Sequence, residues 1–164
     1  MRKKLLQYLS LGIIMLSLAT IVNAKEPIDV LVDKYDGKKG FEVAIIGQDM
    51  LQMVTQVPMI SKDQKRFYEQ TDEMIMISYK GKNPTLESVY NEAMGLFDAE
   101  AHTKTEEIKD KGVIGRAYCV EEGGFATKIS VVMNTGKELI ISVVKGKYDE
   151  AAFQEAQKPQ KGMF

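Results

Sequence analysis

The chain has 164 residues with a nearly balanced charge of 22 Lys and Arg against 23 Asp and Glu, and 45% of its residues are hydrophobic. This length suits one domain with its own core, and the charge balance argues against nucleic acid or anionic lipid as the main partner. The single cysteine, Cys119, permits no internal disulfide, so we expect packing to stabilise the fold.

The first 24 residues have the layout of a secretory signal peptide. Basic residues at positions 2–4 precede a short apolar core at residues 11–19, and no further charge occurs before Lys25. We predict export and cleavage before Lys25. Cleavage removes three of the 22 basic residues and none of the 23 acidic ones, which leaves a net charge of −4. The uncharged stretch is about 20 residues long, close to the length that spans a bilayer, so membrane attachment through an uncleaved segment is the alternative.

The first part of the mature chain alternates between helix and strand patterns. A proline opens a short helix with apolar residues at helical spacing over residues 27–37. A strand is predicted over residues 41–46, and a helix over residues 49–56 that Pro58 ends. The nearly continuous apolar run at residues 73–79 predicts a strand that is covered on both faces.

A basic segment separates the second helix from this strand. Lys62, Lys65 and Arg66 stand next to Phe67 and Tyr68. We interpret the segment as a solvated connector, and a surface that meets a partner is the alternative.

The second part begins with the strongest helix signal in the chain, over residues 83–101. Asn83 can cap this helix and Pro84 fits its first position. The pattern then becomes a meander, with a polar edge strand predicted over residues 104–109 and a further strand over residues 113–121.

Residues 128–145 predict a β-hairpin with apolar residues on both faces, which indicates two central strands. A three-residue loop with Gly136 in the left-handed conformation pairs Val131 with Leu139. A two-residue loop would instead pair Val131 with Ile140. We expect the first register, because it keeps more apolar partners together.

A short helix over residues 149–157, with Phe153 facing inward, and a frayed tail over residues 158–164 complete the chain. The predicted organisation is therefore a signal peptide (1–24), one α+β domain (25–157) and a flexible tail (158–164). We expect a mixed or antiparallel sheet that ends in a β-meander, with helices packed on one face. The strand order does not follow from this pattern.

Several segments resemble a family of exported proteins of Gram-negative bacteria known as domain of unknown function 4252. The resemblance rests on the signal peptide, on Lys34-Tyr35 at the end of the first helix, and on the run FEVAIIGQDMLQMV. It also rests on the closing run ISVVMNTGKELIISVVKGKYDEAAFQEA. It implies an envelope location and supplies no established activity or site residues. Many members look like lipoproteins, whereas this chain lacks the cysteine that would carry the lipid.

Methionine is locally enriched, at Met50, Met53, Met59, Met74 and Met76. Thioether clusters in exported proteins can bind Cu(I), which makes Met50, Met53, Met74 and Met76 the outside candidates for a metal site. Methionine is also an adaptable core residue. We expect Met50 and Met53 to face the sheet, and Met74 and Met76 to share one strand face, so our interpretation is core packing.

Asp98 and His102 lie one helical turn apart, with Glu100 between them on another face. They lack a third metal ligand from the same segment, so we interpret them as a solvated helix end with a favourable cation near the C-terminus. Cys119 is expected to be a buried structural thiol, with a reactive thiol as the alternative.

No set of catalytic or cofactor-binding residues stands out in the sequence. We therefore expect an exported, non-enzymatic domain that binds a protein or ligand of the envelope. The alternatives are a regulatory partner of an envelope signalling system and an enzyme whose site is assembled from dispersed carboxylates and lysines. The edge strand at 104–109 is a possible site for strand addition, although its charge opposes pairing.

Overall fold

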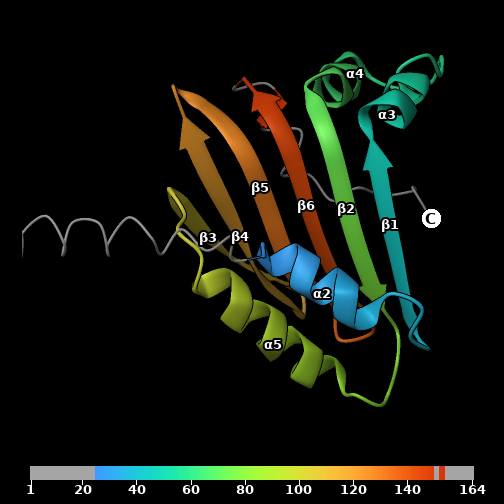
Figure 1. Cartoon of the computed structure of the whole chain (residues 1–164), viewed down its shortest axis with the longest axis vertical. Helices are drawn as coiled ribbons and strands as arrows, with labels where there is room; N and C mark the ends of the chain where they lie inside the picture. The colour runs from blue at the N-terminus through green and yellow to red at the C-terminus, as the bar shows by residue number, and fades with distance from the viewer. Residues whose placement is uncertain (1–24, 150–151, 154–164) are drawn as a thin grey trace, which may run out of the picture.

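Six antiparallel strands form one sheet in the order β1-β2-β6-β5-β4-β3 (Figure 1). The computed structural model describes residues 25–149 and 152–153. The strands are β1 (Phe41–Gly47), β2 (Thr71–Tyr79), β3 (Lys104–Asp110), β4 (Val113–Glu122), β5 (Phe125–Asn134) and β6 (Leu139–Tyr148). The helices in this part of the chain are α2 (Pro27–Tyr35), α3 (Gln48–Val54), α4 (Lys62–Glu69) and α5 (Leu86–Asp98). The expected α+β class, with an antiparallel sheet that ends in a meander, is confirmed.

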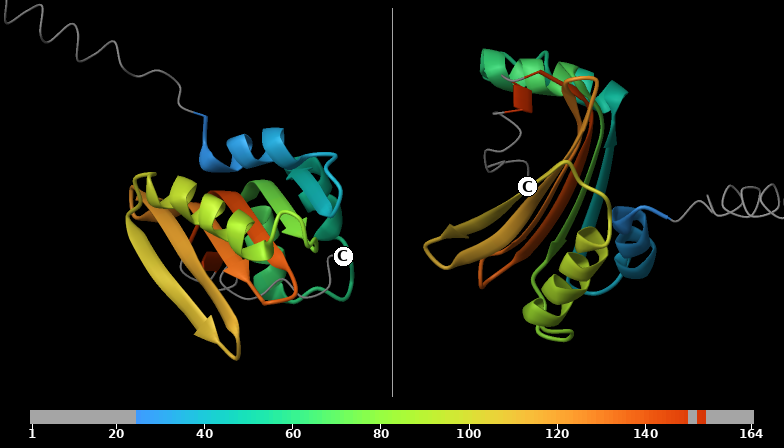
Figure 2. Two further views of the ribbon diagram at one scale, coloured as in Figure 1. Left: turned by 90° about the horizontal axis from the view of Figure 1, so that it is seen from below. Right: turned by 90° about the vertical axis from the view of Figure 1, so that its left-hand side faces the viewer.

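The sheet carries a hydrophobic core on each face. α2 and α5 lie on the same side of the curved sheet, and α3 and α4 lie at the end where β1 finishes and β2 begins (Figures 1 and 2). The first core joins α2 and α5 to the middle of the sheet. The second joins α3, α4 and Ala152 to the opposite face, and its strand residues are Met74, Met76, Cys119, Ala126, Ile129, Val144 and Tyr148. The central strands are therefore buried on both sides, and the prediction that the helices pack on one face was wrong, because α3 and α4 pack on the other face.

The β5–β6 hairpin has a register that differs from both sequence predictions. Asn134 pairs with Leu139, and Val131 pairs with Ser142, so four residues form the loop. Within this loop the Thr135 hydroxyl accepts a hydrogen bond from the Glu138 N–H at 3.0 Å. Gly136 adopts the predicted left-handed conformation, with φ of 79°. Because both faces of β5 and β6 are apolar, hydrophobic matching does not distinguish the registers well, and the loop hydrogen bonds favour the observed one.

The segment that the sequence indicated as a basic connector is helix α4. The Ser61 hydroxyl accepts from the Gln64 N–H at 3.1 Å, and the Gln64 side chain accepts from the Ser61 N–H at 3.0 Å, which is a complete capping box. Phe67 and Tyr68 are buried in the second core. Lys62, Lys65 and Arg66 are exposed, as predicted, but the segment is a helix and not a connector, because its two rings anchor it to the sheet.

Other element boundaries shift by a few residues. α5 begins after Thr85, whose hydroxyl accepts from the Ser88 N–H at 3.2 Å, and not at the predicted Asn83 cap. β6 continues past Gly146 to Tyr148. Of the predicted closing helix (149–157), Asp149 and residues 152–153 are described, and of these only residues 152–153 are helical. The predicted signal peptide and tail lie outside the described residues. Within the part that the structure describes, no helix combines the length and apolar character needed to cross a membrane.

Asp149 joins the end of β6 to α4. Its Oδ2 accepts hydrogen bonds from Arg66 Nε and Gln70 Nε2, both at 2.7 Å, and its Oδ1 accepts from the Ala152 N–H at 3.1 Å. The hydrogen bonds from Gln70 and from the Ala152 backbone, together with the Arg66 guanidinium, lower the pKa of Asp149 to about 2. The folded chain therefore stabilises the ionised carboxylate of Asp149 over its protonated form.

We expect Asp149→Asn to remove a pH-dependent part of the stability. Because the pKa of Asp149 is lower in the folded chain than the value of about 3.9 in an unfolded chain, its contribution is present above pH 4. That contribution is lost as the pH falls from about 4 to about 2. Urea unfolding between pH 2 and pH 7 should show a gap between wild type and variant that closes at the acid end. Asp36→Asn, at an exposed turn, serves as the control, and a gap that stays constant with pH would contradict this account.

Candidate functional site

Four apolar side chains project into solvent from α3 and the segment that follows it. Their exposed fractions are 58% for Met50, 70% for Met53, 47% for Val57 and 92% for Met59. We call these four residues the methionine surface. All four fall within ten consecutive positions of the chain (50–59), whereas most other large apolar residues of the described part lie in the two cores.

The orientation of α3 explains why these methionines are exposed. Leu51 is buried in the second core, and Val54, one turn later, packs against it. Met50 and Met53 form the neighbouring stripe of the helix, which faces away from the sheet. The prediction that Met50 and Met53 face the sheet was wrong. Helix α3 has two apolar stripes, one with Leu51 and one with Met50 and Met53. Because α3 is attached to the end of β1, the stripe with Leu51 is the one that packs against the sheet.

The candidate Cu(I) methionines do not lie in one environment. Met74 and Met76 are buried on the same face of β2, as predicted, and belong to the second core. Met50 and Met53 lie in solvent. Two of the four thioethers therefore fill the core and two belong to the methionine surface.

Strand β1 leads directly into the methionine surface. It lies at one edge of the sheet, and α3 follows at its end (Figure 1). Ile45 on this strand has an exposed fraction of 57%. Five of the six strongly exposed large apolar residues of the described part therefore lie in β1, in α3 and in the segment that follows α3.

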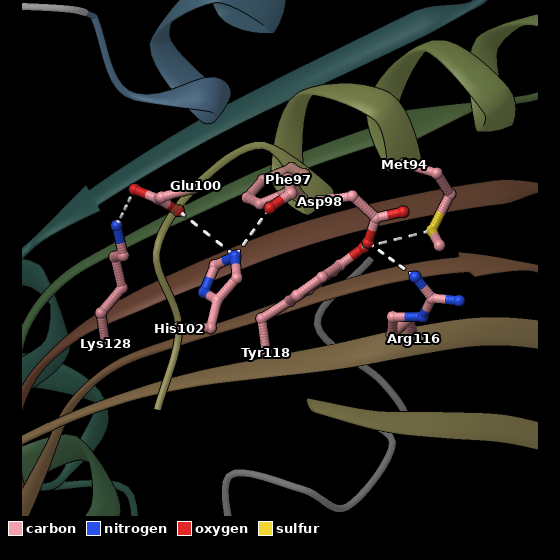
Figure 3. A network of polar contacts seen from close by, with 8 residues as sticks. All are labelled: Met94, Phe97, Asp98, Glu100, His102, Arg116, Tyr118 and Lys128. Atoms are coloured by element: carbon pink, nitrogen blue, oxygen red, sulfur yellow. Dashed lines mark hydrogen bonds and ion pairs between the residues drawn. The ribbon is translucent and has the colours of Figure 1, made fainter. Parts of the chain in front are cut away.

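A polar network at the C-terminal end of α5 is the second candidate (Figure 3). Asp98 Oδ1 accepts hydrogen bonds from the Tyr118 hydroxyl at 2.8 Å and from Arg116 Nη1 at 2.6 Å. Arg116 and Tyr118 lie on β4 and point toward the same face. Glu107 on β3 is 3.6 Å from Arg116 Nη2. The carboxylate predicted to be solvated therefore connects α5 to the sheet.

His102 binds a different partner from Asp98. Its side chain is only 7% exposed, its Nε2 donates to the Phe97 carbonyl at 2.7 Å, and its ring centroid lies 4.6 Å from that of Tyr118. The prediction of a solvated helix end was wrong for this histidine, which is buried against the last turn of α5. Lys128 pairs with Glu100 nearby (Figure 3).

Asp98 and His102, which lie one helical turn apart in the sequence, bind different protein groups in the structure. Each of the two side chains is already bonded to protein groups. Across the described residues, no group of three or more His, Cys, Asp or Glu side chains is placed to hold a metal ion.

A cavity of about 440 Å³ opens beside this network. Its lining residues are Asp98, Glu100, His102, Thr105, Glu106, Glu107, Arg116 and Tyr118. Burial raises the pKa of Asp98, but the hydrogen bonds from Tyr118 and Arg116 outweigh it and hold that pKa below its ordinary value. Burial and then the bond to Asp98 raise the pKa of Tyr118. Asp98 is therefore ionised and Tyr118 protonated near neutral pH, which does not suit either group to proton transfer.

Cys119 has the properties of the structural thiol that the sequence predicted. Its side chain is buried in the second core on β4. Burial, and then the charge of Glu121, raise the pKa of the thiol. The protonated, enclosed sulfur matches the structural interpretation and not the reactive one.

The sequence did not predict the side chains of β4 that bind Asp98 at the end of α5. Nothing in the local sequence links Arg116 and Tyr118 to Asp98, because the contact depends on where β4 lies relative to α5. Comparisons of this chain with family models, curated proteins and solved structures found no match.

Proposed function

We propose that this chain is an exported, non-catalytic protein of the Gram-negative envelope that binds another envelope protein through the methionine surface. The exposed cluster of Met50, Met53, Val57 and Met59 is the observation that carries the proposal. The signal-peptide pattern of residues 1–24 supports export to the periplasm, and the resemblance to exported proteins supports the same location.

The chemistry of the methionine surface favours a protein partner. Six large apolar side chains of the described chain are strongly exposed, and four of them fall between positions 50 and 59. Concentrated apolar exposure in a soluble domain is typical of an interaction site. Methionine side chains are flexible and polarisable, so they adapt to the apolar surface of a partner. Residues 50–59 themselves contain no Lys or Arg, so the apolar side chains dominate this surface, and the exposed basic residues of α4 lie beside it.

A regulatory partner of an envelope signalling system is a narrower form of the same proposal. An enzyme would have to use the polar cavity at the end of α5. The bonded state of Asp98, Arg116 and His102, and the pKa shifts of Asp98 and Tyr118, weigh against acid–base chemistry there.

The proposal is tested by affinity capture with the mature chain, residues 25–164, from an envelope extract. The variant Met50→Gln/Met53→Gln/Met59→Gln replaces three thioethers with polar side chains of similar length. Ile114→Gln is the matched control, because Ile114 is 46% exposed and lies on β4, away from this surface. We expect one partner at a stoichiometric ratio with wild type and control, and at least a tenfold loss with the triple variant.

Two further measurements complete this test. All variants should keep the wild-type melting temperature within a few degrees, because exposed substitutions usually change stability by about 0.5 kcal/mol or less. Equal capture by the triple variant, or capture of nothing by the wild type at moderate salt, would contradict the proposed role of the methionine surface.

A further inference from the structure

Strand β1 presents unpaired backbone groups along one edge of the sheet. Among the described residues it pairs with β2 alone. The Gly40 carbonyl accepts from the Lys80 N–H at 3.1 Å, on the β2 side. Because backbone groups alternate in direction along an antiparallel strand, Val43, Ile45 and Gly47 direct their N–H and C=O groups away from β2. No strand of the described part of the chain pairs with these groups.

The two edges of the sheet differ in their protection against pairing. β3, the opposite edge, has the sequence KTEEIKD, in which five of seven residues are charged. β1 has the sequence FEVAIIG, in which only Glu42 is charged. β1 contains no proline or lysine, and its register with β2 is continuous without a bulge. It therefore lacks the proline, lysine or bulge that protects sheet edges in other proteins.

We propose that two copies of this chain form a dimer by pairing their β1 strands antiparallel about Ala44. A twofold axis through Ala44 places Val43 of each copy opposite Ile45 of the other, on the face that carries α2. Both residues direct their backbone groups toward the second copy, so the ladder continues from one sheet into the next. The exposed Ile45 side chain loses contact with water in the same step.

Charge complementarity selects a second copy of this chain as the occupant. Antiparallel pairing about Ala44 brings the start of β1 in one copy beside the end of β1 in the other, so the turn that carries Lys39 lies near Asp49 in the first turn of α3 of the second copy, and the symmetry makes this pair twice. A register shifted by two residues in either direction moves these opposite charges apart along the strands and weakens both pairs. The segment formed by β1 and its flanking residues is thus complementary in charge to the same segment of a second copy. This inference does not depend on the methionine surface, for which we propose a different protein as the partner.

The dimer is tested by sedimentation velocity and native mass spectrometry on the mature chain, residues 25–164, at micromolar concentrations. We expect wild type to dimerise, and Ile45→Lys to weaken the dimer at least tenfold. Lys39→Glu and Asp49→Lys should each weaken it about tenfold, and the double variant should return to within about threefold of wild type. Lys137→Glu, in the exposed β5–β6 loop, is the control for a charge change elsewhere.

A cysteine at the proposed axis gives a second measurement. Ala44 of both copies forms a non-hydrogen-bonded pair with Cα atoms about 4.5 Å apart, which is within the range of a disulfide. We expect Ala44→Cys to form a covalent dimer under mild oxidation much faster than Glu42→Cys, whose opposite residue is Ile46.

Three outcomes would overturn the proposal. They are a wild-type chain that stays monomeric up to about 100 times the concentration used for the assay, a dimer that Ile45→Lys leaves unchanged, and a charge swap that fails to restore binding. The first two exclude β1 pairing, and the third excludes the Ala44-centred register.

Discussion

Gly146→Ala is expected to lower the free energy of unfolding by about 3 kcal/mol and the melting temperature by about 10 °C. Gly146 lies on β6, where the chain passes the end of α4. A Cβ atom there would lie 2.0 Å from the Gln70 carbonyl oxygen and 3.1 Å from Thr71 Cα. These are backbone atoms, so no side-chain rotation relieves the clash.

The same carbonyl has a structural role that limits how far it can move. The Gln70 oxygen accepts a hydrogen bond from the Lys147 N–H at 3.0 Å, next to the position where β2 and β6 change register. The clash therefore displaces either the end of α4 or the start of the β2–β6 ladder.

Thermal and urea unfolding measure the effect of Gly146→Ala. Gly95→Ala is the matched control: Gly95 lies within α5, and an added Cβ meets no atom within 4 Å. Alanine is a better helix former than glycine, so this control should be more stable than wild type by about 0.5–1 kcal/mol. A Gly146→Ala variant as stable as wild type would show that the approach of β6 to Gln70 is not close in solution.

Tyr79→Ala is expected to cost about 3–5 kcal/mol, the other large effect. Tyr79 is fully buried in the first core. Its ring stacks on Phe41 with centroids 4.0 Å apart, and Phe41 stacks on Tyr35 at 4.1 Å. This column of three rings joins α2, β1 and β2, so its loss leaves a cavity and removes the support of the edge strand.

Tyr79→Phe separates the ring from the hydroxyl. The Tyr79 hydroxyl donates to the Pro84 carbonyl at 2.6 Å, in the segment that leads into α5. Phenylalanine keeps the column and loses this bond, so we expect a cost of about 1 kcal/mol in urea unfolding. Equal losses for Tyr79→Ala and Tyr79→Phe would assign the stability to the hydrogen bond and contradict the packing argument.

Local patterns predicted most of the strands and helices because each element has a strong periodic signal of its own. The apolar run of β2 and the central position of β5 and β6 followed from β-branched residues on both faces. The same two-sided character hid the register of the β5–β6 hairpin, since slipping the strands keeps apolar residues on both faces. The four-residue loop contains hydrogen bonds of Thr135 and Asn134, and a prediction based on hydrophobic matching takes no account of such bonds.

Helix α4 was predictable from the sequence and was missed. Ser61 and Gln64 have the spacing of a capping box, and Phe67 and Tyr68 fall on one face a turn later. Basic residues dominate the segment and obscured this signal. The methionine surface was not predictable in the same way, because which stripe of a seven-residue helix meets the sheet depends on its attachment to β1. The bonds of Asp98 to β4 depend on the packing of α5 and have no local signal.

The asymmetry between the charged strand β3 and the apolar strand β1 limits how far strand pairing can extend. Growth of a cross-β fibre requires each molecule to accept a neighbour on both sides of its sheet. A molecule joined through β1 has only β3 left to offer, and the charges of KTEEIKD oppose a further strand. The apolar edge β1 can therefore pair with one further chain without starting a fibre, because the charged edge β3 stops the growth of the sheet.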